Sequence, residues 1–170
     1  MRHLSKLCLC LGFVGCSNNG DDTLDIVTGK IGGADFQMTS AAVIIATPPE
    51  TDRVEVLLGD FDICIDAPLG RSANSSTIRV VLFADNLAPA YFPTTDSAER
   101  RGSVSDFHRI DGSCDWVAGT YADTGGVTVT KVDGNLLSAT LELSSPDGDV
   151  ATGSFHTTCV VRQGPSDVCN

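Results

Sequence analysis

The residues that could carry acid–base chemistry in this sequence are few. The chain has three histidines, and the first, His3, lies in a short basic N-terminal segment. His156 stands beside threonines on the polar face of an expected strand, so we expect it to be exposed to solvent. His108, in the sequence DFHR, is the better candidate for a site. A catalytic histidine needs a serine or cysteine within hydrogen-bonding reach, and no spacing in the sequence identifies one.

Other catalytic patterns are equally incomplete. Residues 102–106, with the sequence GSVSD, have only a superficial likeness to the Gly-x-Ser-x-Gly nucleophile elbow, because the strand–turn–helix context is missing. The carboxylates of the Asp-Gly turns lack the aromatic platforms of a sugar-cleaving cleft, since Trp116 is the only tryptophan. We therefore assign no catalytic residue from the sequence.

Three aspartates alternate with apolar residues in the segment from 60 to 66. Asp60, Asp62 and Asp66 would share one face of a strand predicted over residues 61–66. Calcium prefers several oxygens gathered in one loop, and a flat row on a strand does not gather them. We expect a solvated acidic face that discourages edge pairing. The sequence calls for no metal and no cofactor.

Aromatic residues give one indication of a binding surface. Tyr91, Trp116 and Tyr121 fall in or beside expected loops, where amphipathic rings can line a ligand or partner surface. The same rings could instead cover the ends of the core. Ordinary packing is the interpretation that we favour.

The seven cysteines form two groups. Three lie within the first sixteen residues, and four follow at wide spacing: Cys64, Cys114, Cys159 and Cys169. The wide spacing contains no Cys-x-x-Cys element, which argues against zinc. Four cysteines in an oxidising compartment predict two disulfides, with three pairings that the sequence cannot separate. Because Cys159 and Cys169 could close a short loop, we favour that pair together with Cys64–Cys114.

The elements that must position these residues are β-strands. From residue 24 onward apolar residues recur mainly at every second position, and Gly, Pro, Asn or Asp interrupts every eight to twelve residues. The clearest part is a C-terminal three-stranded meander with turns at residues 133–135 and 146–149, whose last strand is expected to run from Val150 to Val161. The fold class predicted is all-β, an antiparallel β-sandwich, with a small β-barrel as the alternative. Upstream strands are expected near residues 24–31, 35–38, 42–47, 53–59, 61–66, 77–84 and 104–110.

One short helix is expected. Asp96 can cap residues 97–101, Glu99 completes a capping box, and Gly102 can end the helical turn.

Length and charge limit the organisation and the partners. The chain has 170 residues with a net charge of −11, which suits one ordinary domain, placed at residues 24–170. All the acidic residues lie beyond position 15, whereas Arg2 and Lys6 lie before it. A chain starting at residue 16 would therefore have nine basic and 22 acidic residues, a net charge of −13. Such a surface repels nucleic acids.

The N-terminus has the form of an export signal. Residues 1–6 are basic, residues 7–15 are apolar, and a polar stretch follows. The sequence Phe13-Val14-Gly15-Cys16 resembles the lipobox of bacterial lipoproteins, although Phe13 stands where that family usually has leucine. The resemblance implies a signal peptide over residues 1–15, lipid on Cys16 and a tether over residues 16–23. A plain signal peptide cut just past Cys16, or a buried N-terminal strand, is the alternative.

The resemblance also implies a location. Ser17 after the lipidated cysteine favours the outer membrane in the sorting rule of such lipoproteins. We therefore expect a protein of the bacterial cell envelope, on the periplasmic side or at the cell surface, held to the membrane by the lipid on Cys16.

A second resemblance covers most of the mature chain. The motifs GKIGGADF at residues 29–36, GTY at 119–121, and GVTVT with GSF in the C-terminal part are similar to those of a loose group of uncharacterised predicted bacterial lipoproteins with a small β-rich domain. These motifs are glycine turns and strand residues. The resemblance supports the fold and implies no activity.

Two classes of function fit these observations. The first is a lipid-anchored, non-enzymatic envelope protein that binds a protein or glycan partner or has a structural role. The second is a small hydrolase or a carrier of an apolar ligand, with a site near His108 and with Tyr91 or Trp116 at its mouth. A filled interior between the strands favours the first class, and a hollow interior favours the second.

Overall fold

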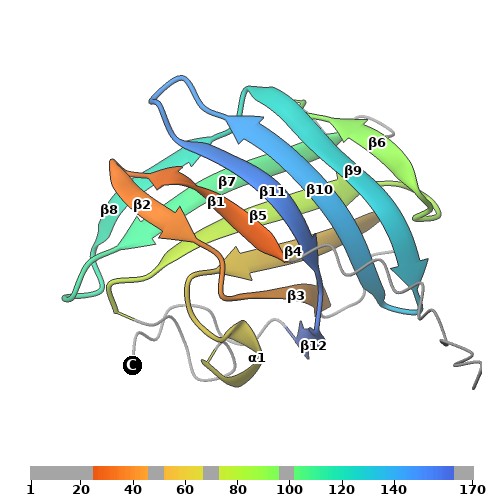
Figure 1. The fold of residues 1–170 in the computed structure, drawn as a ribbon, viewed down its shortest axis with the longest axis horizontal. Coiled ribbons are helices and arrows are strands. Elements are labelled where there is room, and N and C mark those ends of the chain that lie inside the picture. Colours follow the sequence, from red (N-terminus) through yellow and green to blue (C-terminus); the bar gives the residue numbers. More distant parts are fainter. Residues whose placement is uncertain (1–24, 46–51, 67–72, 96–101, 163–170) are drawn as a thin grey trace, which may run out of the picture.

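A computed structural model describes residues 25–45, 52–66, 73–95 and 102–162 (Figure 1). These residues form two six-stranded sheets that face each other, as predicted for an all-β sandwich. Sheet A has the strand order β2 (Ala34–Gln37), β1 (Ile26–Ile31), β11 (Val150–His156), β10 (Leu136–Ser144), β9 (Thr124–Asp133) and β6 (Ala90–Pro93). Sheet B has the order β12 (Cys159–Arg162), β3 (Ser40–Ile45), β4 (Arg53–Gly59), β5 (Ser76–Phe83), β7 (Ser103–Ile110) and β8 (Trp116–Tyr121).

Alternating apolar residues fill the space between the sheets. In β5, Ile78, Val80 and Leu82 face inward and are buried, and β10 presents Leu137, Ala139, Leu141 and Leu143 in the same way. Among the described residues, Phe107 and Phe155, from opposite sheets, are the bulkiest of the fully buried side chains. The interior is therefore packed with side chains, which is the arrangement expected of a sandwich.

The predicted C-terminal meander is confirmed. Strands β9, β10 and β11 pair antiparallel in succession, and Gly134 and Gly148 take positive φ angles of 61° and 88° in the two connecting turns. A residue with a Cβ atom is disfavoured in this backbone region, which explains the Asp-Gly sequences. The last strand is shorter than predicted. It ends at His156, and the chain crosses to the other sheet, where β12 pairs parallel to β3.

The crossing is fixed by two threonines. The Thr157 hydroxyl accepts a hydrogen bond from the Leu137 backbone N–H at 2.9 Å, within sheet A. The backbone N–H of Thr158 donates to the Ala41 carbonyl at 3.0 Å, within sheet B. The prediction of one continuous strand to Val161 was wrong because apolar and polar residues go on alternating where the chain leaves sheet A and enters sheet B.

The strand predicted over residues 61–66 is also wrong. Residues 63–66 form a single helical turn, α1 (Ile63–Asp66). The Asp62 carboxylate accepts a hydrogen bond from the Cys64 N–H at 3.1 Å, and Ser40 Oγ accepts one from the Ile63 N–H at 2.8 Å. These bonds satisfy donors that the start of a helix leaves free. Ile63 is fully buried against Ala42 and Val161 on the outer face of sheet B.

The disulfide pairing favoured from the sequence is incorrect. Cys64 of α1 is bonded to Cys159 of β12, with 6.0 Å between their Cα atoms. The contact of α1 with β3 and β12, which the sequence does not reveal, brings the two cysteines together. Cys114, in the turn between β7 and β8, is disulfide-bonded as well. Cys169 lies outside the described residues.

Several sequence expectations fall outside the described part of the chain. They are the signal peptide, Cys16 and its tether, and the helix expected at residues 97–101. Two strands that the sequence does not predict, β6 and β8, contain the aromatic residues Tyr91, Trp116 and Tyr121, which were expected in or beside loops. Among the described residues, no helix has the length and apolar character needed to cross a membrane.

Candidate functional site

The outer face of sheet B carries a row of charged and aromatic side chains. Strand register places Arg79 of β5 opposite Asp106 of β7, and Asp106 opposite Tyr121 of β8. On the other side of Arg79, Glu55 of β4 accepts hydrogen bonds from Nε at 2.8 Å and from Nη2 at 3.1 Å. This bond to Glu55 is the largest of the effects that raise the pKa of Arg79 above its ordinary value. Arg79 therefore stays charged beside Asp106.

Asp106 and His108 form a close pair next to this row. They are two residues apart on β7, so both side chains lie on the outer face. The Nε2 atom of His108 is 2.5 Å from Oδ1 of Asp106, and the Asp106 side chain is only 5% exposed. Arg79 Nη1 approaches the other carboxylate oxygen at 3.7 Å. Removing a carboxylate from water costs free energy, and the two basic groups beside Asp106 offset that cost.

Strand β8 covers this pair from the side of the sheet edge. The Trp116 and His108 rings meet edge to face, with their centroids 4.6 Å apart. Trp116, Val117 and Tyr121 are 52%, 49% and 65% exposed. We call these three residues, together with Asp106 and His108, the β8 face. They line a shallow recess of about 510 Å³.

The β8 face brings together residues that the sequence had singled out separately. His108, Trp116 and Tyr121 meet there, whereas Tyr91 lies on β6 in the other sheet. Asp106 was not recognised as the partner of His108, although its spacing of two residues on a predicted strand was a usable signal. Glu55 and Arg79 were missed because they come from other strands, and only the register places them in the row.

The chemistry available to His108 is limited by its neighbours. Its Nε2 lies close to Asp106 Oδ1, but neither that oxygen nor the buried Nδ1 of His108 has a hydrogen-bond partner of suitable geometry among the described residues. The pair therefore has a base and a carboxylate that orients it, but no described hydroxyl or thiol is bonded to the imidazole. Nucleophilic catalysis needs that third group. In the described part of the chain, no three His, Cys, Asp or Glu side chains cluster as metal ligands would.

The remaining charged candidates have local structural roles. His156 is exposed as predicted, and its Nδ1 contacts the Asp25 carboxylate. The expected acidic row does not exist, because Asp62 caps α1 and both oxygens of Asp60 accept hydrogen bonds from the Ser76 N–H, each at 3.0 Å. Burial raises the pKa of Asp60 above its ordinary value, although the bonds from Ser76 act in the opposite direction.

A second hollow crosses the outer face of sheet A. One cross-strand row contains Ile26, Ser154, Thr140, Thr128 and Tyr91 in register, and it lines a trough of about 540 Å³ together with Glu142. The Tyr91 hydroxyl donates to the Gly125 carbonyl at 3.1 Å. A Cβ atom at Gly126 would lie 2.9 Å from the Tyr91 ring. Glycine at this position thus lets the ring lie flat across the strand.

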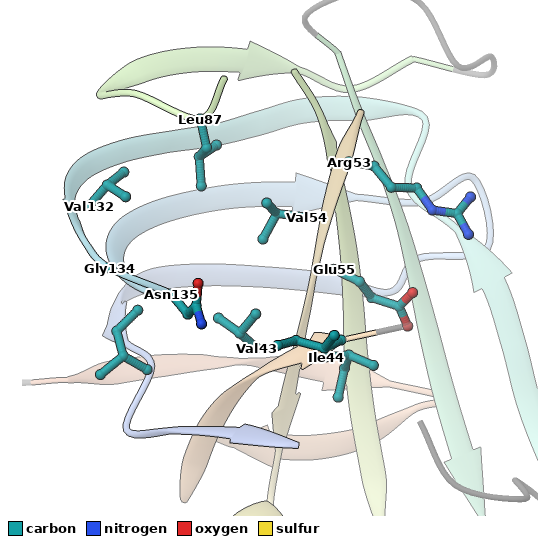
Figure 2. Close-up of a pocket in the computed structure, with 11 residues that line it drawn as sticks. Val43, Ile44, Arg53, Val54, Glu55, Leu87, Val132, Gly134 and Asn135 are labelled. Carbon is teal, nitrogen blue, oxygen red and sulfur yellow. The ribbon is translucent and has the colours of Figure 1, made fainter. Parts of the chain in front are cut away.

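A third hollow lies at one end of the sandwich (Figure 2). Val43 and Val54 from sheet B, Val132 and Leu136 from the β9–β10 hairpin, and Leu87 line this cleft of about 380 Å³. Arg53 and Glu55 lie at its rim, with Glu55 already engaged by Arg79. Ile45, the last described residue of β3, also lines this cleft.

Comparison with known proteins adds no assignment. No protein-family model, no curated protein and no solved structure matches this chain.

Proposed function

We propose that this chain is a lipid-anchored, non-enzymatic binding protein of the bacterial cell envelope that holds a protein partner against the β8 face. The observation that carries the proposal is the exposure of three large side chains, Trp116, Val117 and Tyr121, on one six-residue strand. Clusters of exposed aromatic and apolar side chains are typical of protein interfaces, where such residues supply much of the binding energy.

The electrostatics support a binding role for this face. The Asp106 carboxylate lies between His108 and Arg79, and the Trp116 ring packs edge to face on His108. A rigid aromatic side chain loses little conformational entropy when a partner binds. A net charge of −13 beyond residue 15 would attract basic partners, with association rates that fall as salt is added.

The location in the proposal rests on the N-terminal sequence. Lipid on Cys16 followed by a polar tether over residues 17–23 would hold the acidic domain away from the anionic membrane surface. A partner could then reach the outer face of sheet B.

Trp116 is the only tryptophan, so its fluorescence reports directly on the β8 face. We expect a protein partner isolated from envelope extracts to shift this emission and to bind Trp116→Ala at least about ten-fold more weakly. Tyr91→Ala removes a comparably exposed ring from the other sheet and should bind as the unmodified protein does. Equal loss in both variants, or no partner sensitive to Trp116, would contradict the proposal.

The trough on sheet A supports a second candidate, a glycan partner. A neutral sugar chain offers apolar ring faces and hydroxyl groups. In the trough, the Tyr91 ring, which is hydrogen-bonded to Gly125, can stack on a sugar ring, and the threonine and serine hydroxyls and the Glu142 carboxylate can bond its hydroxyl groups. Binding to a glycan array that is lost in Tyr91→Ala and kept in Trp116→Ala would support this candidate. Binding that is lost only in Trp116→Ala would move the glycan to the β8 face and refute it.

A further inference from the structure

The four edge strands of the two sheets differ in how they are protected. An exposed edge carries unpaired backbone N–H and C=O groups, and natural proteins block it with charged residues or proline. Within the described residues, β2 has Asp35, β6 has Pro93 and β12 has Arg162. Strand β8, with the sequence WVAGTY, has no charged residue and no proline. It is the unprotected edge of the described sheets.

The hydrogen-bond pattern shows which backbone groups of β8 face outward. The Ala122 N–H, just after the strand, donates to the Ser105 carbonyl of β7 at 2.9 Å. Backbone groups alternate in direction along an antiparallel strand, so those of Thr120 also face β7. The N–H and C=O groups of Gly119 and Tyr121 therefore point to the side on which no described strand pairs.

We infer that the β8 edge accepts an extended polypeptide segment of a partner protein, which pairs with Gly119 and Tyr121 as an added strand of sheet B. This inference rests on the proposed function and specifies how the partner binds. Backbone hydrogen bonds along an edge supply affinity, and pockets for alternate side chains supply specificity. Here Trp116 and Tyr121 lie on the outer face, where they would contact every second side chain of the added strand.

Charge at the two ends of β8 specifies the segment further. Asp115 precedes the strand and Asp123 follows it closely, and both are exposed. A segment with an uncharged, β-prone centre and basic residues at both ends would match this distribution. Six strand residues span about 20 Å, so a peptide of roughly ten residues covers the strand and both acidic ends.

The test uses the mature protein and a displayed library of randomised peptides of roughly ten residues. Recovered peptides are measured against Val117→Lys, which adds a charge to the open edge, and against Val160→Lys on β12. Both valines are partly exposed, at 49% and 38%, so both variants are expected to fold. We expect β-prone peptides with basic ends that bind Val117→Lys at least about ten-fold more weakly and Val160→Lys unchanged.

Backbone pairing is tested with the same peptides carrying N-methyl groups on alternate amides. One of the two methylation registers should abolish binding, and the unmodified peptide should slow amide hydrogen exchange at Gly119 and Tyr121. A different outcome is that peptides methylated in either register bind the unmodified protein fully and yet fail to bind Trp116→Ala. In that case the partner contacts the β8 face alone, so strand addition is wrong and the proposed function stands. If no selected peptide depends on Trp116 or Val117, both fail.

Two further outcomes would overturn the inference. Slow exchange at Gly119 and Tyr121 in the protein alone would mean that another part of the chain already covers the edge. A dimer in sedimentation experiments that becomes a monomer in Val117→Lys would identify the occupant as a second copy of the chain.

Discussion

The imidazole of His108 faces the carboxylate of Asp106 on the outer face of β7, with 2.5 Å between Nε2 and Oδ1. The carboxylate is almost completely buried, although it lies on the face of the sheet that points away from the core. Arg79 and His108 lie against it, Tyr121 is opposite it in register, and Trp116 packs on the far side of the pair through its contact with His108.

Removing the charge of Asp106 should destabilise the fold. In Asp106→Asn the charge of Arg79 loses one partner and His108 loses its carboxylate, so we expect the free energy of unfolding to fall by about 2–4 kcal/mol. Chemical denaturation measures the change. Asp133→Asn removes an exposed partner of Lys131 and serves as the control, with an expected change within about 0.5 kcal/mol. Equal effects in the two variants would contradict a structural role for the buried pair.

The disulfides can be checked by proteolytic mapping without reduction. We expect one cross-linked peptide pair from Cys64 and Cys159. Cys114 is also disulfide-bonded, and beyond Cys16 the one remaining cysteine is Cys169, so we expect a second pair that joins these two. The first bridge joins residues 95 positions apart. Replacing both Cys64 and Cys159 by alanine should lower stability by about 2–5 kcal/mol because the unfolded chain regains freedom. A Cys64–Cys114 peptide would contradict the observed pairing.

The regular strands of this fold could be predicted from the sequence, and the irregular connections could not. Alternation identified β4, β5, β7 and the meander, because each buries one face. The same alternation misassigned α1, since Ile63 faces sheet B from a helical turn that depends on Ser40, a residue distant in sequence. Alternation also gave no sign that the chain leaves sheet A after β11 and joins sheet B as β12, because that change depends on hydrogen bonds of Thr157 and Thr158 to residues of different sheets.

The candidate site was predictable only in part for the same reason. Asp106 and His108 are two residues apart, so their shared face follows from one strand alone. Their contacts with Arg79, Trp116 and Tyr121 need the register of β5, β7 and β8. Register between distant strands is set by packing of the whole core, and no local pattern in one sequence specifies it.

Asp60 gives the fold a defined pH dependence. Burial raises its pKa in the folded protein, so the folded state holds the proton more tightly than the unfolded chain does. The stabilising effect of that proton is complete below the ordinary aspartate pKa of about 3.9 and is lost as the pH rises through the higher folded-state value. Compared with Asp60→Asn, the unmodified protein should therefore lose stability between acidic and neutral pH. Parallel pH profiles of unfolding for the two proteins would disprove this.

His108 distinguishes the binding function from the hydrolase alternative. If the β8 face only binds, esterase, protease and glycosidase substrates should show no turnover above the blank with the unmodified protein or with His108→Ala. The substitution should instead weaken partner binding, because Trp116 loses the ring that it contacts. Turnover by the unmodified protein that disappears in His108→Ala would show that the imidazole acts as a base and would favour the hydrolase.

Cys16 should be the first residue of the mature protein and should carry the lipid. Several acyl chains on one residue bind a membrane durably, whereas a single chain gives only reversible attachment. In Cys16→Ser we therefore expect the protein to move from the detergent phase to the aqueous phase of a detergent partition. Cys64→Ser removes a cysteine of the folded domain and should leave the lipid in place. Mass spectrometry of the purified N-terminus decides the matter, since an unmodified N-terminus at Ser17 or later would refute lipidation and leave the tether without its anchor.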